Sequence, residues 1–231
     1  MFFEIKEYDI TLTVKSGLYI GTGDSAVKIG GVDNEFIKHP ISKLPYIPGS
    51  SLKGKIRSLL EYDAGILLLR EDKISSDVLT INDYKNCNGE QKEQIKKVLM
   101  LFGAFGSDYN KDIGITRLSF ADLELVDEYK QNPADSLEVK AETAIDRKTG
   151  TAKNGSLRFT ERVGEGVEFT GKITMKQFQG DEKEELEKTL FRGIHLLMKD
   201  TLGGAGSRGY GRVAVRFNDA KIQEAFEKYT L

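Results

Sequence analysis

The segment at residues 44–57, LPYIPGSSLKGKIR, has residue types that suit phosphate binding. Its Pro-Gly pair predicts a turn that leads into a helix, with Ser50 or Ser51 as the N-cap. The N–H groups and the positive dipole end of a helix start favour an anion such as phosphate. Three cations follow within five residues, namely Lys53, Lys55 and Arg57. An ordinary capped helix with a solvated basic face is the alternative interpretation.

A second candidate site is the glycine-rich loop at residues 203–212, GGAGSRGYGR. Five of its ten residues are glycine, which lets a backbone approach a ligand closely. Arg208 and Arg212 could pair with phosphate, and Tyr210 could stack on a base. The alternatives are a flexible surface loop and, for Tyr210, a place in the core near Val213.

A third segment that could do chemistry contains Asp33. This segment is KIGGVDNE at residues 28–35, a glycine-bearing loop that follows GTGD at residues 21–24. A carboxylate on such a loop could accept a proton or hold a metal ion. Aspartate after glycine is also a common turn residue, and the residues alone favour this structural role.

Four stretches alternate apolar and polar residues as half-buried strands do. They are 10–14, 118–125, 167–175 and 213–217, and a parity slip between Phe120 and Leu123 predicts a bend. Helical spacing of apolar residues predicts helices over 52–60 and 186–197. The order strand, helix, strand, strand, helix, strand is that of the ferredoxin-like arrangement also used by RNA-recognition modules. We therefore predict an α+β fold with a β-α-β-β-α-β core, an antiparallel sheet with two helices on one face.

Two connections are too long for a minimal version of this fold. The first, at about residues 63–115, is predicted to be a partly helical lid, because Ile95, Val98, Leu99 and Phe102 have helical spacing. The second, residues 127–165, is polar and carries the turn signal RKTG at 147–150, which predicts a protruding hairpin. We expect a single domain over residues 1–231 with these two insertions.

Composition excludes several classes of protein. Its 34 Lys and Arg against 36 Asp and Glu give a net charge of −2, so the chain is no bulk polycation. No apolar run reaches the ~18 residues of a membrane span, and the first residues do not resemble a signal peptide, so we expect a cytoplasmic protein without membrane contact. Cys87, His39 and His195 are the only cysteine and histidines. They exclude a disulfide framework and are too few for a self-contained zinc site.

Taken in order, these motifs resemble those of a known family. GTGD at 21–24, GVDN at 31–34, LPYIPGSSLKGKIR at 44–57 and RGYGR at 208–212 follow one another along the chain. The chain resembles the repeated backbone subunit of type III-A CRISPR effector complexes, the Csm type, in the RAMP superfamily. The proline-glycine segment and the C-terminal glycine loop are typical of RAMP proteins generally. Gly31-Val32-Asp33 narrows the resemblance to the backbone subunit that cleaves.

The resemblance implies an assembly and an activity. In that family, copies of the subunit stack into a helical filament along a guide RNA, together with other Csm subunits. A protruding hairpin, the thumb, interrupts the guide–target duplex at six-nucleotide intervals. The resemblance therefore implies a metal-dependent endoribonuclease that cleaves complementary target RNA once per subunit, with a divalent cation such as Mg²⁺. It maps the thumb onto residues 127–165.

The resemblance also assigns roles to single residues. The target-cleaving aspartate falls on Asp33, which is also the candidate metal ligand. Contacts to RNA are expected at Tyr19, Ser50, Ser51, Lys53, Lys55, Arg57, Arg147, Lys148, Arg208, Tyr210 and Arg212. Many relatives have histidine where Tyr19 stands. Some members hold structural zinc in the first insertion, and Cys87 alone does not support that here.

Two other functions stay open at this point. The chain could be a non-catalytic scaffold that presents guide RNA while another subunit cleaves, with Asp33 as a turn residue. It could also be the related endonuclease that trims guide precursors, although RAMP enzymes of that kind generally rely on histidine or other basic groups, and histidine is scarce here. Oligomerisation separates the classes, because filament subunits multimerise on long RNA whereas a processing enzyme cuts a hairpin as a monomer.

Overall fold

The central element of the fold is an antiparallel sheet, seen in a computed structural model that describes residues 3–23, 31–66, 78–104 and 110–229. Neighbouring strands follow the order β2-β4-β7-β1-β8, and β3 also pairs with β7. The strands are β1 (Phe3–Val14), β2 (Tyr46–Ile47), β3 (Leu118–Phe120), β4 (Leu123–Leu125), β7 (Glu168–Phe178) and β8 (Val213–Phe217). The prediction of an α+β fold with an antiparallel sheet is confirmed.

The predicted strands form because one face of each is apolar. Tyr8, Ile10, Leu12 and Val14 alternate along β1 and are all completely buried. β7 pairs with β1 over its full length, and β8 pairs with the other edge of β1. The predicted bend is also confirmed, since residues 118–125 divide into β3 and β4, which pair with different parts of β7.

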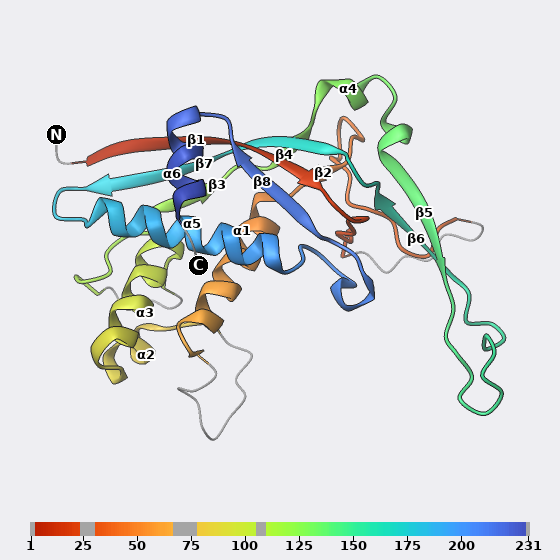
Figure 1. Cartoon of the computed structure of the whole chain (residues 1–231), viewed down its shortest axis with the longest axis horizontal. Coiled ribbons are helices and arrows are strands. Elements are labelled where there is room, and N and C mark those ends of the chain that lie inside the picture. The colour runs from red at the N-terminus through yellow and green to blue at the C-terminus, as the bar shows by residue number, and fades with distance from the viewer. Residues whose placement is uncertain (1–2, 24–30, 67–77, 105–109, 230–231) are drawn as a thin grey trace.

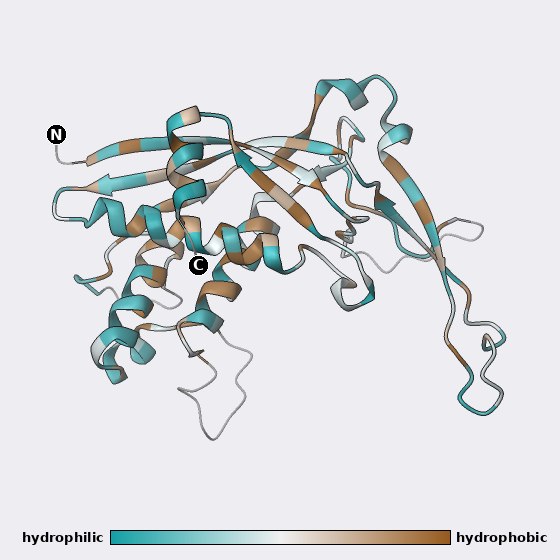
Figure 2. Ribbon diagram, viewed as in Figure 1, coloured by the Kyte–Doolittle hydropathy of each residue, from teal (hydrophilic) through white to brown (hydrophobic). Residues whose placement is uncertain are grey.

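Helices cover one side of the sheet (Figure 1). The predicted helices are confirmed as α1 (Gly49–Asp63), α3 (Gly89–Phe102) and α5 (Lys183–Lys199). α1 and α5 approach closely at Gly193, where an added Cβ would lie 2.6 Å from the Ile56 side chain. In Figure 2, hydrophobic and hydrophilic residues alternate along the strands of the sheet and along the helices that cover it. This is expected for elements with one buried face.

The predicted protruding hairpin is present as β5 (Leu137–Glu142) paired antiparallel with β6 (Arg158–Val163). We call residues 137–163 the thumb hairpin. It extends past the end of the main sheet, with the loop between β5 and β6 at its far end (Figure 1). The turn predicted at its tip is closed by a bridge between Ile145 and Ala152. Two short elements precede it, α4 (Asp127–Lys130) and the 3₁₀ turn η2 (Pro133–Ser136).

Some elements had no clear periodic signal in the sequence. They are α2 (Ile81–Asn86), α6 (Ala220–Lys228), the 3₁₀ turn η3 (Gly206–Arg208) and the two-residue β2. All are short, and a hydrophobic period needs a longer window to stand out. The caps of α2 and α6 would have been the usable signal, since Thr80 and Asp219 accept from backbone N–H groups of their helices.

The predicted N-cap of α1 is wrong. The helix begins at Gly49, so Pro48 is the N-cap, and Ser50 and Ser51 lie inside the first turn without capping it. Instead, the Asp122 carboxylate accepts the Gly49 N–H at 2.8 Å. Gly49 permits this because a Cβ there would lie 2.4 Å from the Phe120 carbonyl oxygen. One of the N–H donors at the start of α1 is therefore already bonded to a carboxylate from the β3–β4 turn.

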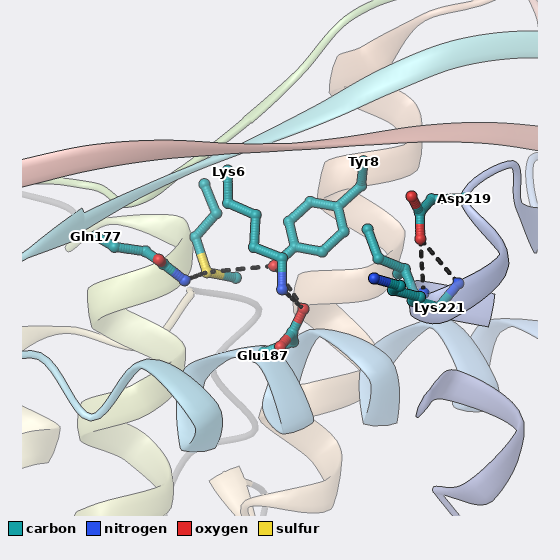
Figure 3. Close-up of polar contacts among 8 residues, drawn as sticks. Lys6, Tyr8, Gln177, Glu187, Asp219 and Lys221 are labelled. Carbon is teal, nitrogen blue, oxygen red and sulfur yellow. Dashed lines mark hydrogen bonds and ion pairs between the residues drawn. The ribbon is translucent and has the colours of Figure 1, made fainter. Parts of the chain in front are cut away.

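A polar cluster joins β1 to α5 on the helix-covered side of the sheet (Figure 3). The Tyr8 hydroxyl donates to Glu187 Oε1 at 2.9 Å, and Lys6 forms an ion pair with the same oxygen. Burial, together with the negative charge of Glu187, raises the pKa of Tyr8 far above its ordinary value. The cluster therefore fixes the start of α5 on the sheet while Tyr8 keeps its proton.

We expect the stability supplied by Tyr8 to depend on pH. A buried tyrosine that stays protonated in the folded chain, but ionises in the unfolded chain above a pH of about 10, loses its stabilising effect as the pH rises through that value. Tyr8→Phe should lower the free energy of unfolding by about 1–2 kcal/mol at neutral pH. Urea unfolding of both proteins at several pH values between about 8 and about 11 measures this difference in stability. That range brackets the ordinary tyrosine pKa of about 10. A difference that stays constant over that range would contradict the role of the hydroxyl proton.

Candidate functional site

Asp33 lies against the thumb hairpin. Its backbone N–H donates to the Phe159 carbonyl at 2.9 Å, and the Asn34 N–H donates to the same oxygen at 3.2 Å. In return, the Phe159 N–H donates to Asp33 Oδ2 at 2.6 Å. Further along, the Glu161 N–H donates to the Asn34 carbonyl at 2.9 Å, and Asn34 pairs with Thr160 in a parallel bridge. We call residues 31–38 the Asp33 segment. Through residues 33 and 34 it forms a third, strand-like edge of the small β5–β6 sheet.

The Asp33 carboxylate is anchored at one oxygen and exposed to solvent. Oδ2 accepts the Phe159 N–H, while Oδ1 accepts no hydrogen bond from the residues that the structure describes. Among these residues, no cluster of three or more histidine, cysteine or acidic side chains could hold a metal ion. Sequence spacing did not suggest this anchoring, since Asp33 and Phe159 are 126 positions apart.

A groove of about 610 Å³ opens between the Asp33 segment, the thumb hairpin and the glycine-rich loop. Its lining includes Tyr19, Asn34, Arg158, Thr160, Ala205 and Arg208. The groove therefore brings two predicted residues, Tyr19 and Arg208, to the segment that carries Asp33. Partial burial raises the pKa of Tyr19, so its hydroxyl stays protonated at neutral pH.

Arg158, Asn34 and Thr160 are groove residues that the sequence did not single out. Arg158 is exposed at the start of β6 and pairs in register with Glu142. Asn34 belongs to the GVDN motif, but no local signal placed it or Thr160 in a groove with Arg158. Their placement depends on the pairing of residues 33–34 with β6, where Asn34 Nδ2 donates to Thr160 Oγ1 at 3.1 Å.

The structure corrects the role predicted for Tyr210. Its side chain is completely buried, so the ring cannot stack on a base. Lys140 Nζ lies 4.4 Å from the ring centroid and the Arg162 guanidinium carbon lies 4.7 Å from it. Burial, followed by the charge of Glu142, raises the pKa of Tyr210. Tyr210 therefore joins the glycine-rich loop to the thumb hairpin by cation–π contacts.

The two arginines of the glycine-rich loop remain at the surface. The side chain of Arg208 is 63% exposed, and its Nε lies 3.5 Å from Glu142 Oε2. Arg212 is exposed, and its backbone is tied to the end of β1, because its N–H donates to Ser16 Oγ and its carbonyl accepts the Lys15 N–H. Both guanidinium groups can therefore reach a ligand from the surface of the loop.

The cations of α1 do not converge on one point. Lys55 forms an ion pair with Asp200 at 2.7 Å, beyond the end of α5. Arg57 donates to Glu61 at 2.7 Å and to the Leu79 carbonyl at 3.2 Å, so its guanidinium faces the first insertion. Lys53 forms no ion pair within the described ranges, and partial burial, followed by the charge of Arg57, lowers its pKa.

The remaining predicted residues lie on the surface or outside the described ranges. Ser50 is exposed and Ser51 is half-buried in the first turn of α1. Arg147 and Lys148 are exposed in the tip turn of the thumb hairpin, where the Lys148 N–H donates to Asp146 Oδ1 at 2.8 Å. Asp24 of the GTGD motif and Lys28–Gly30 of the Asp33 loop lie outside the described residues, as do residues 67–77 and 105–109 of the first insertion.

Further observations concern membrane-spanning helices, the cysteine and the two histidines. No helix in the described part of the chain is both long enough and apolar enough to cross a membrane. Cys87 is buried at the end of α2, and burial, followed by the charge of Asp83, raises the pKa of its thiol. His39 is exposed, and His195 packs on Phe226 with ring centroids 4.0 Å apart.

Comparisons with known proteins agree with this arrangement of motifs. The sequence profile of the RAMP superfamily matches residues 11–214. "CRISPR system Cms endoribonuclease Csm3" of Methanocaldococcus jannaschii is 35% identical over 91% of this chain and 77% of its own length. The protein of the same name from Mycobacterium tuberculosis is 37% identical over 93% of this chain and 87% of its own length. The protein of that name from Streptococcus thermophilus is 33% identical over 99% of this chain and 94% of its own length. The chain therefore belongs to the RAMP superfamily and, within it, to the family of these Csm3 proteins.

Proposed function

We propose that this protein is an endoribonuclease and the repeated backbone subunit of a type III-A CRISPR ribonucleoprotein. It binds guide RNA along the phosphate backbone and cleaves complementary target RNA at six-nucleotide intervals. The observation that carries this proposal is the exposed Asp33 carboxylate, anchored on β6 beside a groove with Arg158 and Arg208 in its walls. Relatives that align over most of the chain bear the name endoribonuclease.

The proposed fold is the ferredoxin-like core with two insertions. The strand order β4-β7-β1-β8, with α1 after β1 and α5 after β7, supports this arrangement. The whole chain is one RAMP domain in this proposal. The first insertion, near residues 63–115, carries α2 and α3, and the second, residues 127–165, carries the thumb hairpin.

Guide binding is proposed to use phosphate contacts. Such contacts position a strand without reading its bases, so pairing with the guide supplies sequence specificity. Arg212 and Lys53 offer cations without an ion pair among the described residues, and Tyr19, Ser50 and Ser51 offer hydroxyl groups. Arg208 offers a further exposed cation, which lies 3.5 Å from Glu142. Lys55 and Arg57 would contact phosphate only by sharing or exchanging the ion pairs that they make within the chain. Arg147 and Lys148 place positive charge at the tip of the thumb hairpin.

Cleavage is proposed to proceed by attack of the target's own 2′-hydroxyl on the adjacent phosphorus. The hydroxyl gives up its proton, the new O–P bond forms, and the 5′-oxygen of the next nucleotide leaves. A thumb inserted between base pairs would free the target backbone to reach the in-line geometry that this attack needs. Asp33 acts either as the general base that accepts the proton or as a metal ligand beside the scissile phosphate.

A divalent cation such as Mg²⁺ fits the residues present. Mg²⁺ in nucleotide sites keeps several waters and takes one or two carboxylates plus phosphate oxygens. Asp33 would supply its Oδ1 oxygen, which accepts no hydrogen bond within the described chain. When bound, the ion would neutralise charge at the phosphate. Zinc has no proposed role.

The proposed partners are guide RNA, target RNA, further copies of this chain in a helical filament, and the other Csm subunits. The proposed location is the cytoplasm, without membrane contact. Filament formation predicts that the chain multimerises on long RNA.

Mapping of cleavage products tests the proposal. A guide-loaded complex should cut a complementary RNA into a regular ladder in the presence of Mg²⁺. A single deoxynucleotide at one scissile position should remove that one cut, by at least about 100-fold in rate, and leave the other cuts and the affinity unchanged, because only the attacking hydroxyl is missing. Continued cleavage at the deoxynucleotide would exclude attack by the 2′-hydroxyl.

A further inference from the structure

We infer that Glu161 is a positioning residue for Asp33, and that it couples β6, which holds the cleaving carboxylate, to the body of the protein. The inference rests on the proposed role of Asp33 and names a residue that lies outside the sequence motifs.

Glu161 uses both carboxylate oxygens to hold the chain segment that follows Asp33. Its Oε2 accepts the Phe36 N–H at 3.1 Å, and its Oε1 accepts from Lys38 Nζ at 2.9 Å. The Glu161 side chain is only 15% exposed. Phe36 is buried, so its N–H would lack an acceptor if the Glu161 carboxylate were removed. The ion pair with Lys38 offsets the charge that Glu161 brings to this half-buried place.

The Asp33 segment is attached differently at its two ends. Toward Lys38, it is also held by the body of the protein, since the Ile37 N–H donates to the Ile20 carbonyl at 2.8 Å and Lys38 bridges Pro45. At Asp33 and Asn34, the hydrogen bonds within the described residues all go to β6. Glu161 adds a side-chain link between β6, which holds Asp33, and residues 36–38, which the body of the protein holds, so its loss should let β6 and Asp33 move relative to that body.

The thumb hairpin itself does not need a carboxylate at this position. Glu161 pairs in register with Val139, and Leu137 pairs with Val163 on the same face of the β5–β6 sheet. An apolar or β-branched residue would suit this pairing better than a carboxylate. The contacts to Phe36 and Lys38 are therefore the physical reason for Glu161, and they tie β6, with Asp33 on it, to residues 36–38.

Single-turnover cleavage by guide-loaded complexes tests this role. With saturating target RNA, Glu161→Ala should slow cleavage by about tenfold or more, because a displacement of ~1 Å at a reacting group can cost a factor of ~100. The dissociation constant for the target should stay within about twofold, since phosphate contacts elsewhere hold the RNA. Glu161→Gln keeps an acceptor for the Phe36 N–H and should recover the rate to within about threefold of the wild type.

Matched controls separate positioning from general damage to the thumb. Glu138→Ala removes another carboxylate of the hairpin, which pairs with Arg162 at 2.7 Å and forms no hydrogen bond or ion pair with residues 33–38 in the described part of the chain. It should leave the rate within about twofold of the wild type. Lys38→Met removes the ion pair from the other side and leaves β6 intact, so it replaces Glu161→Ala if that variant does not enter the complex. A wild-type rate for Glu161→Ala or its replacement, or a Gln variant as slow as the Ala variant, would overturn the inference.

Amide hydrogen exchange of the isolated chain tests the same role without relying on cleavage. Glu161→Ala should speed exchange in the peptide that covers residues 31–38 by about tenfold or more, with β1 and β7 unchanged. Unchanged exchange at residues 31–38 would overturn the inference even if the proposed cleavage by Asp33 holds. If Asp33→Asn complexes still cleave, the proposed role of Asp33 fails, and the exchange measurement still decides whether Glu161 holds this segment.

Discussion

Complexes that carry Asp33→Asn should bind complementary RNA as wild type does and cleave it at least about 100-fold more slowly. Asparagine has the shape of aspartate, and its side-chain oxygen can still accept the Phe159 N–H that now bonds to Oδ2 at 2.6 Å. The segment should therefore stay on β6, while the negative charge and the basicity of the side chain are lost. Single-turnover cleavage at saturating target, with affinity measured in parallel, gives both quantities.

Asp33→Ala is the natural companion to this variant. It removes the charge and also the acceptor for the Phe159 N–H, so it should not cleave faster than Asp33→Asn. A cleavage ladder that survives in both variants would assign cleavage to another subunit. The chain would then be a scaffold that presents guide RNA, and Asp33 a residue that shapes its loop.

Gly211→Ala should lower the free energy of unfolding by about 3 kcal/mol or more, through a combination of backbone strain and overlap. Gly211 has φ +78, and a Cβ there would lie 2.1 Å from the Leu202 carbonyl oxygen. The Gly211 N–H donates to the Gly17 carbonyl at 3.0 Å, and its carbonyl accepts the Leu202 N–H at 2.8 Å. An added methyl group would therefore push apart three segments that meet here. Urea unfolding of the isolated chain measures the loss.

Gly209→Ala is the matched control for this prediction. Gly209 also has a positive φ, +85, but a Cβ there would meet nothing within 4 Å. It should cost only the strain of the left-handed conformation, about 1–2 kcal/mol. Equal losses in the two variants would mean that the overlap with Leu202 relaxes at no cost, contrary to our expectation.

These glycines revise the interpretation of the glycine-rich loop. Gly203 and Gly211 let backbone pack on backbone, at Tyr19 and at Leu202 respectively, instead of bringing backbone to a ligand. The loop thereby joins the ends of β1 and α5 to the start of β8. Tyr210 adds the contact to the thumb hairpin through Lys140 and Arg162. The two arginines of this loop are exposed, as are Gly203, Ser207 and Gly209.

The strands and helices of the core could be predicted because each carries its own period. Tyr8, Ile10, Leu12 and Val14 alternate along β1, and Leu52, Ile56 and Leu60 repeat along α1. The apolar face of a strand or helix can be recognised from the local sequence, whatever element that face packs against in the fold. The short elements between residues 78 and 86 and after residue 217 have too few turns to do so.

The sequence alone therefore determined the core strands and helices, the hairpin, the candidate Asp33 and the family that the motifs resemble. Tertiary structure decided the rest, since it depends on residues far apart in the chain. At the start of α1 the carboxylate of Asp122, and not a hydroxyl of Ser50 or Ser51, accepts a backbone N–H, and Tyr210 is buried against the hairpin instead of facing a base. The anchoring of Asp33 joins residues 126 positions apart. A hydrogen bond across such a separation forms only after both partners are placed by the elements that carry them, so no local pattern records it.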